Sequence, residues 1–128
     1  MSRPLLVLIV VAAVAGCAQN MAAAKYVVNK PTVVPAAFPQ LQITQLNGFE
    51  DAQHPGKLYV TPSSSKRLGI ALSGRETQWS AMLPAIEPVY RDAALQILKV
   101  RGHADCIIDA HVPVPKELGI EYAFRCAS

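Results

Sequence analysis

The sequence predicts a small α+β domain, in which one helix packs on a mostly antiparallel sheet that ends in a disulfide-stapled hairpin. Alternating apolar and polar residues indicate half-buried strands, as in 41–46. Apolar residues at helical spacing indicate one amphipathic helix over 84–101. Two short apolar stretches near the C-terminal end each carry a cysteine. A chain of 128 residues has room for one such domain, predicted at 41–128.

The first sixteen residues have the layout of a secretory signal peptide. Arg3 supplies a positive charge, and an unbroken apolar run follows from Leu5 to Ala15. A helix of that length spans roughly 17 Å, which is too short for the ~30 Å hydrocarbon core of a membrane. The run therefore predicts an exported protein from which residues 1–16 are removed.

Val14-Ala15-Gly16-Cys17, at the end of this run, resembles the lipobox of bacterial lipoproteins. The resemblance implies cleavage before Cys17, lipidation of its sulfur and acylation of the new amino terminus by chains such as palmitate. Several acyl chains make a stable anchor, whereas one chain is marginal. Ala18 stands where an aspartate would favour the inner membrane, so the resemblance implies the periplasmic face of the outer membrane. An ordinary signal peptide with a chance cysteine is the alternative.

Residues 17–40 are predicted to be the lipidated cysteine and a tether rich in proline and alanine. Prolines recur every four residues, at positions 31, 35 and 39, which disfavours a helix and favours an extended path. We expect a spacer between membrane and domain. The alternative is that Thr32-Val33-Val34 or Tyr26-Val27-Val28 adds a strand to a partner protein.

The folded part is expected to begin with three short strands joined by loops. We predict strands at 41–46, 58–61 and 68–72, a turn at Asn47-Gly48, and loops at 50–56 and 62–66. In the helix at 84–101, Lys99 and Arg101 lie in the last turn, where cations suit the helix dipole. Trp79 and Tyr90 are expected in the core or at its boundary. The alternative topology is a parallel crossover from 68–72 through the helix to 106–112.

The C-terminal hairpin is predicted to pair 106–112 with 120–126, and its pattern suggests a register. If Cys106 faces Cys126, then Ile108 faces Phe124, Ala110 faces Tyr122 and Val112 faces Ile120, so one face is wholly apolar. The other face then pairs Ile107 with Arg125, Asp109 with Ala123 and His111 with Glu121. A slip by one residue would turn the apolar set outward, so this register is favoured.

With Cys17 lipidated, Cys106 and Cys126 are the two remaining cysteines, and an oxidising compartment favours a disulfide between them. Such a staple would contribute roughly 3 kcal/mol to a small domain. The alternative is a metal site formed by His103, Cys106, His111 and Cys126. Because this spacing matches no compact zinc signature and His111 is expected on the opposite face, the sequence predicts no metal and no cofactor.

Catalytic patterns are weak in this sequence. Ser63 and Lys66 have the Ser-x-x-Lys spacing of penicillin-binding proteins and β-lactamases, but the other motifs of those enzymes are missing and the domain is too short. His54 and His103 have no evident Ser or Cys partner with an orienting acid. The near-neutral charge of the processed chain does not call for nucleic acid. No catalytic residue is assigned.

Residues 94–108 resemble two families. The pattern is the end of a helix, then Gly102-His103-Ala104-Asp105, then the apolar Cys106-Ile107-Ile108. It is loosely similar to the small YbjQ-like proteins and to the disulfide-bonded outer-membrane sensor lipoprotein of the Rcs phosphorelay. That sensor has more cysteines than are available here, so its role is not carried over.

The function expected from these features is that of an outer-membrane-anchored periplasmic lipoprotein, which binds or scaffolds an envelope protein. A short lipoprotein that supports a secretion or conjugation channel is one such role, by architectural analogy. The alternatives are an envelope-stress or redox sensor and, less favoured, a small periplasmic enzyme. Exposed apolar residues gathered on one face would favour binding or sensing, whereas a deep polar pocket around His54 or His103 would favour an enzyme.

Overall fold

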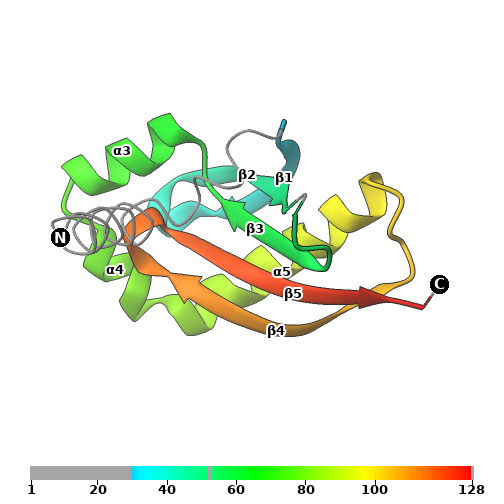
Figure 1. The fold of residues 1–128 in the computed structure, drawn as a ribbon. Helices are drawn as coiled ribbons and strands as arrows, with labels where there is room; N and C mark the ends of the chain where they lie inside the picture. Colours follow the sequence, from blue (N-terminus) through cyan, green and yellow to red (C-terminus); the bar gives the residue numbers. More distant parts are fainter. Residues whose placement is uncertain (1–29, 52, 128) are drawn as a thin grey trace, which may run out of the picture.

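A computed structural model describes residues 30–51 and 53–127, which form one antiparallel sheet with helices (Figure 1). The predicted signal peptide and Cys17 lie outside the described residues. The strand order is β1-β2-β3-β5-β4, which confirms the predicted α+β class. The strands are β1 (Thr32–Phe38), β2 (Ile43–Glu50), β3 (Lys57–Thr61), β4 (Cys106–Val114) and β5 (Gly119–Cys126). The helices are α3 (Ser64–Leu72), α4 (Glu76–Ala81) and α5 (Leu83–Val100), and two 3-10 turns, η1 (Pro39–Leu41) and η2 (Pro115–Glu117), close the outer hairpins.

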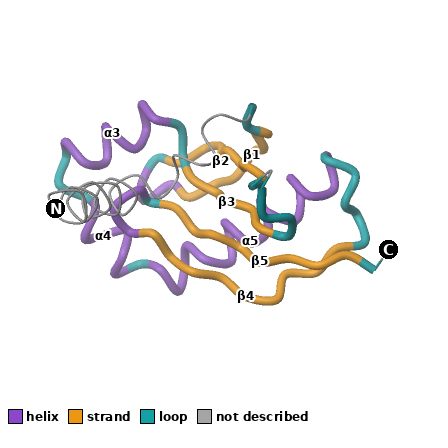
Figure 2. The backbone as a smooth tube through the Cα atoms, in the orientation of Figure 1, coloured by secondary structure: helices purple, strands orange, loops and turns teal. Residues whose placement is uncertain are grey.

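The long helix α5 covers one face of the sheet, as Figure 2 shows. Its bounds confirm the predicted helix at 84–101 to within one residue at each end. Ile86, Ala93 and Ile97 are fully buried on its inner side, against Leu58 and Val60 of β3 in the same core. Burying this apolar stripe is the main driving force for packing the helix on the sheet. No helix among the described residues is long and apolar enough to cross a membrane.

The domain begins earlier than predicted, because Thr32–Phe38 pairs with β2 as an edge strand. The tether therefore does not extend to residue 40. Pro35 is exposed on this edge, where a residue without an N–H group is tolerated. Val34 and Phe38 are buried in the core cluster. The strand that Thr32-Val33-Val34 contributes is thus added to the sheet of its own chain.

The predicted turn at Asn47-Gly48 is wrong, because both residues continue β2 as far as Glu50. Gly48 faces the helix, and a Cβ atom there would lie 2.5 Å from Cδ1 and 2.9 Å from Cγ2 of Ile97. The glycine therefore allows α5 to approach the strand closely. In the sequence, a glycine that allows a helix to approach a strand cannot be distinguished from a glycine in a turn.

The predicted strand at 68–72 is also wrong, because these residues lie in α3. Ser63 caps this helix by accepting a hydrogen bond from the backbone N–H of Lys66 at 3.3 Å. The stretch predicted as a loop at 62–66 therefore contains the start of a helix. The short helix α4 then follows, in a segment for which no element was predicted. Since every strand pair in the sheet is antiparallel, the alternative parallel crossover is excluded.

The C-terminal hairpin forms, but its predicted register holds only near the cysteines. Cys106, Ile107 and Ile108 face the expected partners, and the disulfide between Cys106 and Cys126 is present. The register then shifts by one residue between Ile108 and Ala110. Beyond this bulge the facing pairs are Ala110 with Ala123, His111 with Tyr122, Val112 with Glu121 and Pro113 with Ile120. The predicted pairs Asp109–Ala123, Ala110–Tyr122, His111–Glu121 and Val112–Ile120 are therefore wrong.

Buried polar groups tie the helices to η2 and its flanks. Trp79 and Tyr90 are both fully buried, which confirms their placement in the core. The Trp79 indole N–H donates to the Tyr90 hydroxyl at 3.1 Å, and that hydroxyl donates to the Leu118 carbonyl at 2.8 Å. On the other face of the sheet, the Tyr59 hydroxyl donates to the Glu117 carboxylate. Burial, followed by this hydrogen bond, raises the pKa of Tyr59, so the phenol stays protonated.

Candidate functional site

One candidate site surrounds the disulfide at the C-terminal ends of α5 and β5. The two sulfurs and a ring nitrogen of His103 all lie within 4.8 Å of one another. Cys106 is buried, whereas Cys126 is partly exposed and lines an open pocket of about 400 Å³ together with His103, Asp105 and other residues. The disulfide is thus accessible from one side.

Glu50 fixes the geometry beside this disulfide. Its Oε1 atom lies 3.1 Å from the Nε2 atom of His103 and 3.1 Å from the Nε atom of Arg101. Arg101 also donates to the Thr32 hydroxyl at 3.0 Å, which joins the end of α5 to the first strand. The His103 ring packs against Phe124 with 5.8 Å between centroids. A histidine held by a carboxylate beside two sulfurs can accept or deliver a proton during thiol chemistry.

The four proposed metal ligands do not come together. His111 belongs to another cluster, where its Nδ1 atom lies 3.6 Å from the Glu87 carboxylate and 3.2 Å from Nη2 of Arg91. The bulge in β4 turns this histidine toward α5, which is why the predicted cross-strand contact with Glu121 is replaced. In the observed state Cys106 and Cys126 are bonded to each other, as predicted.

His54 lies in the β2–β3 loop and pairs with Asp51. Its Nδ1 atom lies 2.9 Å from the carboxylate, which also accepts backbone N–H groups of Gln53 and His54 at 2.9 and 3.2 Å. Burial opposes ionisation of Asp51, but these hydrogen bonds together outweigh it and lower its pKa. The arrangement is that of a structural loop in which the carboxylate replaces missing backbone partners.

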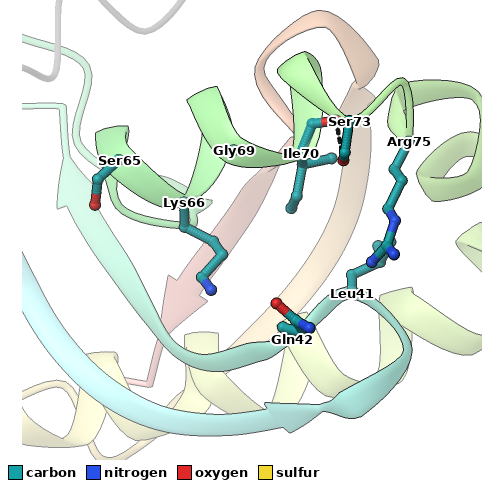
Figure 3. Close-up of a pocket in the computed structure, with 8 residues that line it drawn as sticks. All are labelled: Leu41, Gln42, Ser65, Lys66, Gly69, Ile70, Ser73 and Arg75. Carbon is teal, nitrogen blue, oxygen red and sulfur yellow. Dashed lines mark hydrogen bonds between the residues drawn. The ribbon is translucent and has the colours of Figure 1, made fainter.

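A second candidate site is a basic pocket between α3 and the β1–β2 connection (Figure 3). It encloses about 300 Å³. The lining residues are Leu41, Gln42, Ser65, Lys66, Gly69, Ile70, Ser73 and Arg75. Its two charged residues, Lys66 and Arg75, are both cations. Within 30–51 and 53–127, neither cation forms a salt bridge with a carboxylate.

The polar side chains of this basic pocket come from both ends of α3 and from the β1–β2 connection. Figure 3 shows the Lys66 ammonium facing the oxygen of the Gln42 amide, while the Arg75 guanidinium extends toward Leu41. Ser63, the other member of the Ser-x-x-Lys pattern, is occupied as the cap of α3 and contacts the Ser65 hydroxyl at 3.3 Å. Lys66 therefore lines a pocket, and Ser63 acts as a helix cap in the Ser-x-x-Lys pattern.

Sequence reasoning missed this pocket and the part played by Glu50. Gln42, Lys66 and Arg75 come from three separate segments, and no motif links them. The chain itself matches no protein-family model, no curated protein and no solved structure.

Proposed function

We propose that this chain is a bacterial envelope lipoprotein, anchored through Cys17 to the periplasmic face of the outer membrane, that binds or scaffolds another envelope protein. The observation that carries the anchoring proposal is the lipobox-like Val14–Cys17 directly after a short apolar run. An exported, oxidising location agrees with the Cys106–Cys126 disulfide.

The start of β1 at Thr32 shortens the proposed tether. About fourteen residues then separate Cys17 from the sheet, and even fully extended they reach no more than roughly 50 Å. The domain would work close to the membrane surface. A partner is therefore expected to be itself membrane-associated or to approach the membrane closely.

The binding role is supported by the sheet face that α5 does not cover. Val33 on β1 and Ile107 and Val112 on β4 are each at least half exposed, at 50%, 51% and 58%. They alternate with residues that point toward the helix, so all three belong to the opposite face. Between them lie Phe49 and the fully buried Tyr59. Val33 lies on one edge strand of the sheet and Ile107 and Val112 on the other, so apolar side chains are exposed at both edges of this face. Edge strands are typical places for a partner to bind.

This role is tested by photocrosslinking in intact cells. A crosslinking amino acid at Val112 should capture a specific envelope protein, while the same probe at the exposed Lys99 on α5 should not. Cys17→Ser should abolish acyl labelling and membrane association and reduce the capture at Val112. Equal capture at both positions, or none at Val112, would overturn the binding role. The anchor is tested separately, by the acyl labelling.

A second candidate function, redox sensing, is favoured by one observation. Cys126 is partly exposed and faces the pocket that also holds His103. A partner that reads the oxidation state would be captured differently by the wild type and by the Cys106→Ser/Cys126→Ser variant. Identical capture by both, with the variant shown to be folded, would eliminate the sensor.

A further inference from the structure

We propose that the basic pocket between α3 and the β1–β2 connection binds a phosphate group. The pocket is independent of the membrane anchor and of the exposed sheet face, so the inference goes beyond the proposed function. Its charge is wholly positive, since Lys66 and Arg75 are its charged lining residues. A ligand of opposite charge is the simplest partner for such a donor set.

Three separate segments of the fold supply these donors. Gln42 follows η1 with φ 56°, and its backbone N–H donates to the Pro39 carbonyl at 3.0 Å, so its position is set by the turn. Lys66 lies in the first turn of α3, which Ser63 caps. At the other end of the helix, the backbone N–H of Arg75 donates to the Ile70 carbonyl at 3.0 Å. The three donors thus extend from hydrogen-bonded backbone.

The number of donors favours phosphate, because a carboxylate has only two oxygens. A guanidinium offers a planar pair of N–H groups that matches two phosphate oxygens, and an ammonium and an amide can satisfy the third. The volume of about 300 Å³ exceeds that of one phosphate group, so a small organic substituent also fits. Leu41 and Ile70 supply apolar surface for that substituent.

Gly69 gives the pocket a place where charge can be changed without disturbing the fold. A Cβ atom at this position meets nothing within 4 Å, although the residue lies within α3 and lines the pocket. Glutamate and glutamine are both better helix formers than glycine. Gly69→Glu therefore introduces a negative charge at the pocket, and Gly69→Gln introduces nearly the same volume without it.

The test is calorimetric titration of the full chain, in mild non-ionic detergent at constant ionic strength, with inorganic phosphate and glycerol phosphate. We expect saturable binding that Lys66→Gln and Arg75→Gln each weaken about tenfold or more. Gly69→Glu should weaken it further than Gly69→Gln. Lys99→Gln, which removes an exposed cation on α5, should leave it unchanged. Circular dichroism and the melting temperature establish that each variant is folded.

A further arm distinguishes the source of the phosphate group. Glycerophosphoglycerol reproduces the diester headgroup of an anionic phospholipid, whereas glycerol phosphate is a soluble monoester. Tighter binding of the diester assigns the pocket to a lipid headgroup, and tighter binding of the monoester assigns it to a soluble metabolite. The proposal is overturned if none of these compounds binds at about 10 mM. It is equally overturned if binding persists in the Lys66→Gln and Arg75→Gln variants.

Discussion

At the scale of single residues, Gly48 decides how closely α5 approaches the sheet. Its missing side chain makes room for Ile97, which is fully buried. We expect Gly48→Ala to lower the free energy of unfolding by about 1–3 kcal/mol, the usual cost of overpacking a core. Urea denaturation measures this loss.

A double mutant separates this close contact from a general effect of alanine. Ile97→Val removes the Cδ1 atom that the new Cβ would approach, so Gly48→Ala should cost less in the Ile97→Val background than in the wild type. Gly69→Ala, in open space on α3, should be neutral or slightly stabilising. Additive costs for Gly48→Ala and Ile97→Val would show that the contact is not the cause.

Asp51 makes the β2–β3 loop sensitive to acid. Because hydrogen bonds lower its pKa in the folded state, the carboxylate stabilises the fold at pH values above the unfolded pKa of about 3.9. This contribution is lost as the pH falls below that value and through the lower folded pKa. Asp51→Asn should therefore be less stable than the wild type at neutral pH, and the difference should vanish in strong acid.

Urea midpoints measured from pH 7 down to pH 2 test this dependence. His54→Ala removes only the ring contact to Asp51, since the backbone N–H groups remain, so its effect should be smaller than that of Asp51→Asn. A gap between wild type and Asp51→Asn that stays constant across the whole range would contradict the assignment.

At the scale of elements, the disulfide joins the two strands of a hairpin that carries one bulge, between Ile108 and Ala110. The bond closes a loop with a sequence separation of 20, at the end of the hairpin opposite to η2. Replacing both cysteines by alanine should lower the free energy of unfolding by about 3 kcal/mol. Neither cysteine should react with a thiol reagent in the unfolded, unreduced chain. Reactivity there, or unchanged stability of the double variant, would argue against the staple.

Elements with strong periodicity were predictable from the sequence, and those defined by tertiary contacts were not. The helix α5 and the strand β3 follow clear apolar patterns and are confirmed. Residues 68–72 are a short apolar run, which periodicity alone does not assign to strand or helix. In the structure they belong to α3, which begins after the Ser63 cap. The bulge near Asp109 leaves no signal in the apolar pattern of either strand, so the register was correct only as far as Ile108.

At the scale of the whole molecule, the sequence predicted the covalent staple but not the pockets. The apolar pattern of the two strands places Cys106 opposite Cys126, and a bond between them follows from that register. A pocket such as the one formed by Gln42, Lys66 and Arg75 depends on how α3 lies against η1. The strand predicted at 68–72 would not have brought these side chains together.

The proposed mature chain would consist of the anchor, a short connection and the domain. Cleavage before Cys17 would leave a lipidated residue, a short connection to Thr32 and a sheet whose open face carries Val112. The anchor and the short connection would hold the domain close to the membrane surface. The anchor is the claim on which the proposed location depends.

The most direct test is mass spectrometry of the protein purified from bacterial membranes. The account predicts an amino-terminal peptide that begins at Cys17 and carries the mass of a diacylglyceryl group on sulfur and an acyl chain on nitrogen. In the Cys17→Ser variant this modified peptide should be absent. A wild-type chain that retains Met1, or whose mature amino terminus is unmodified or begins elsewhere, would contradict the account.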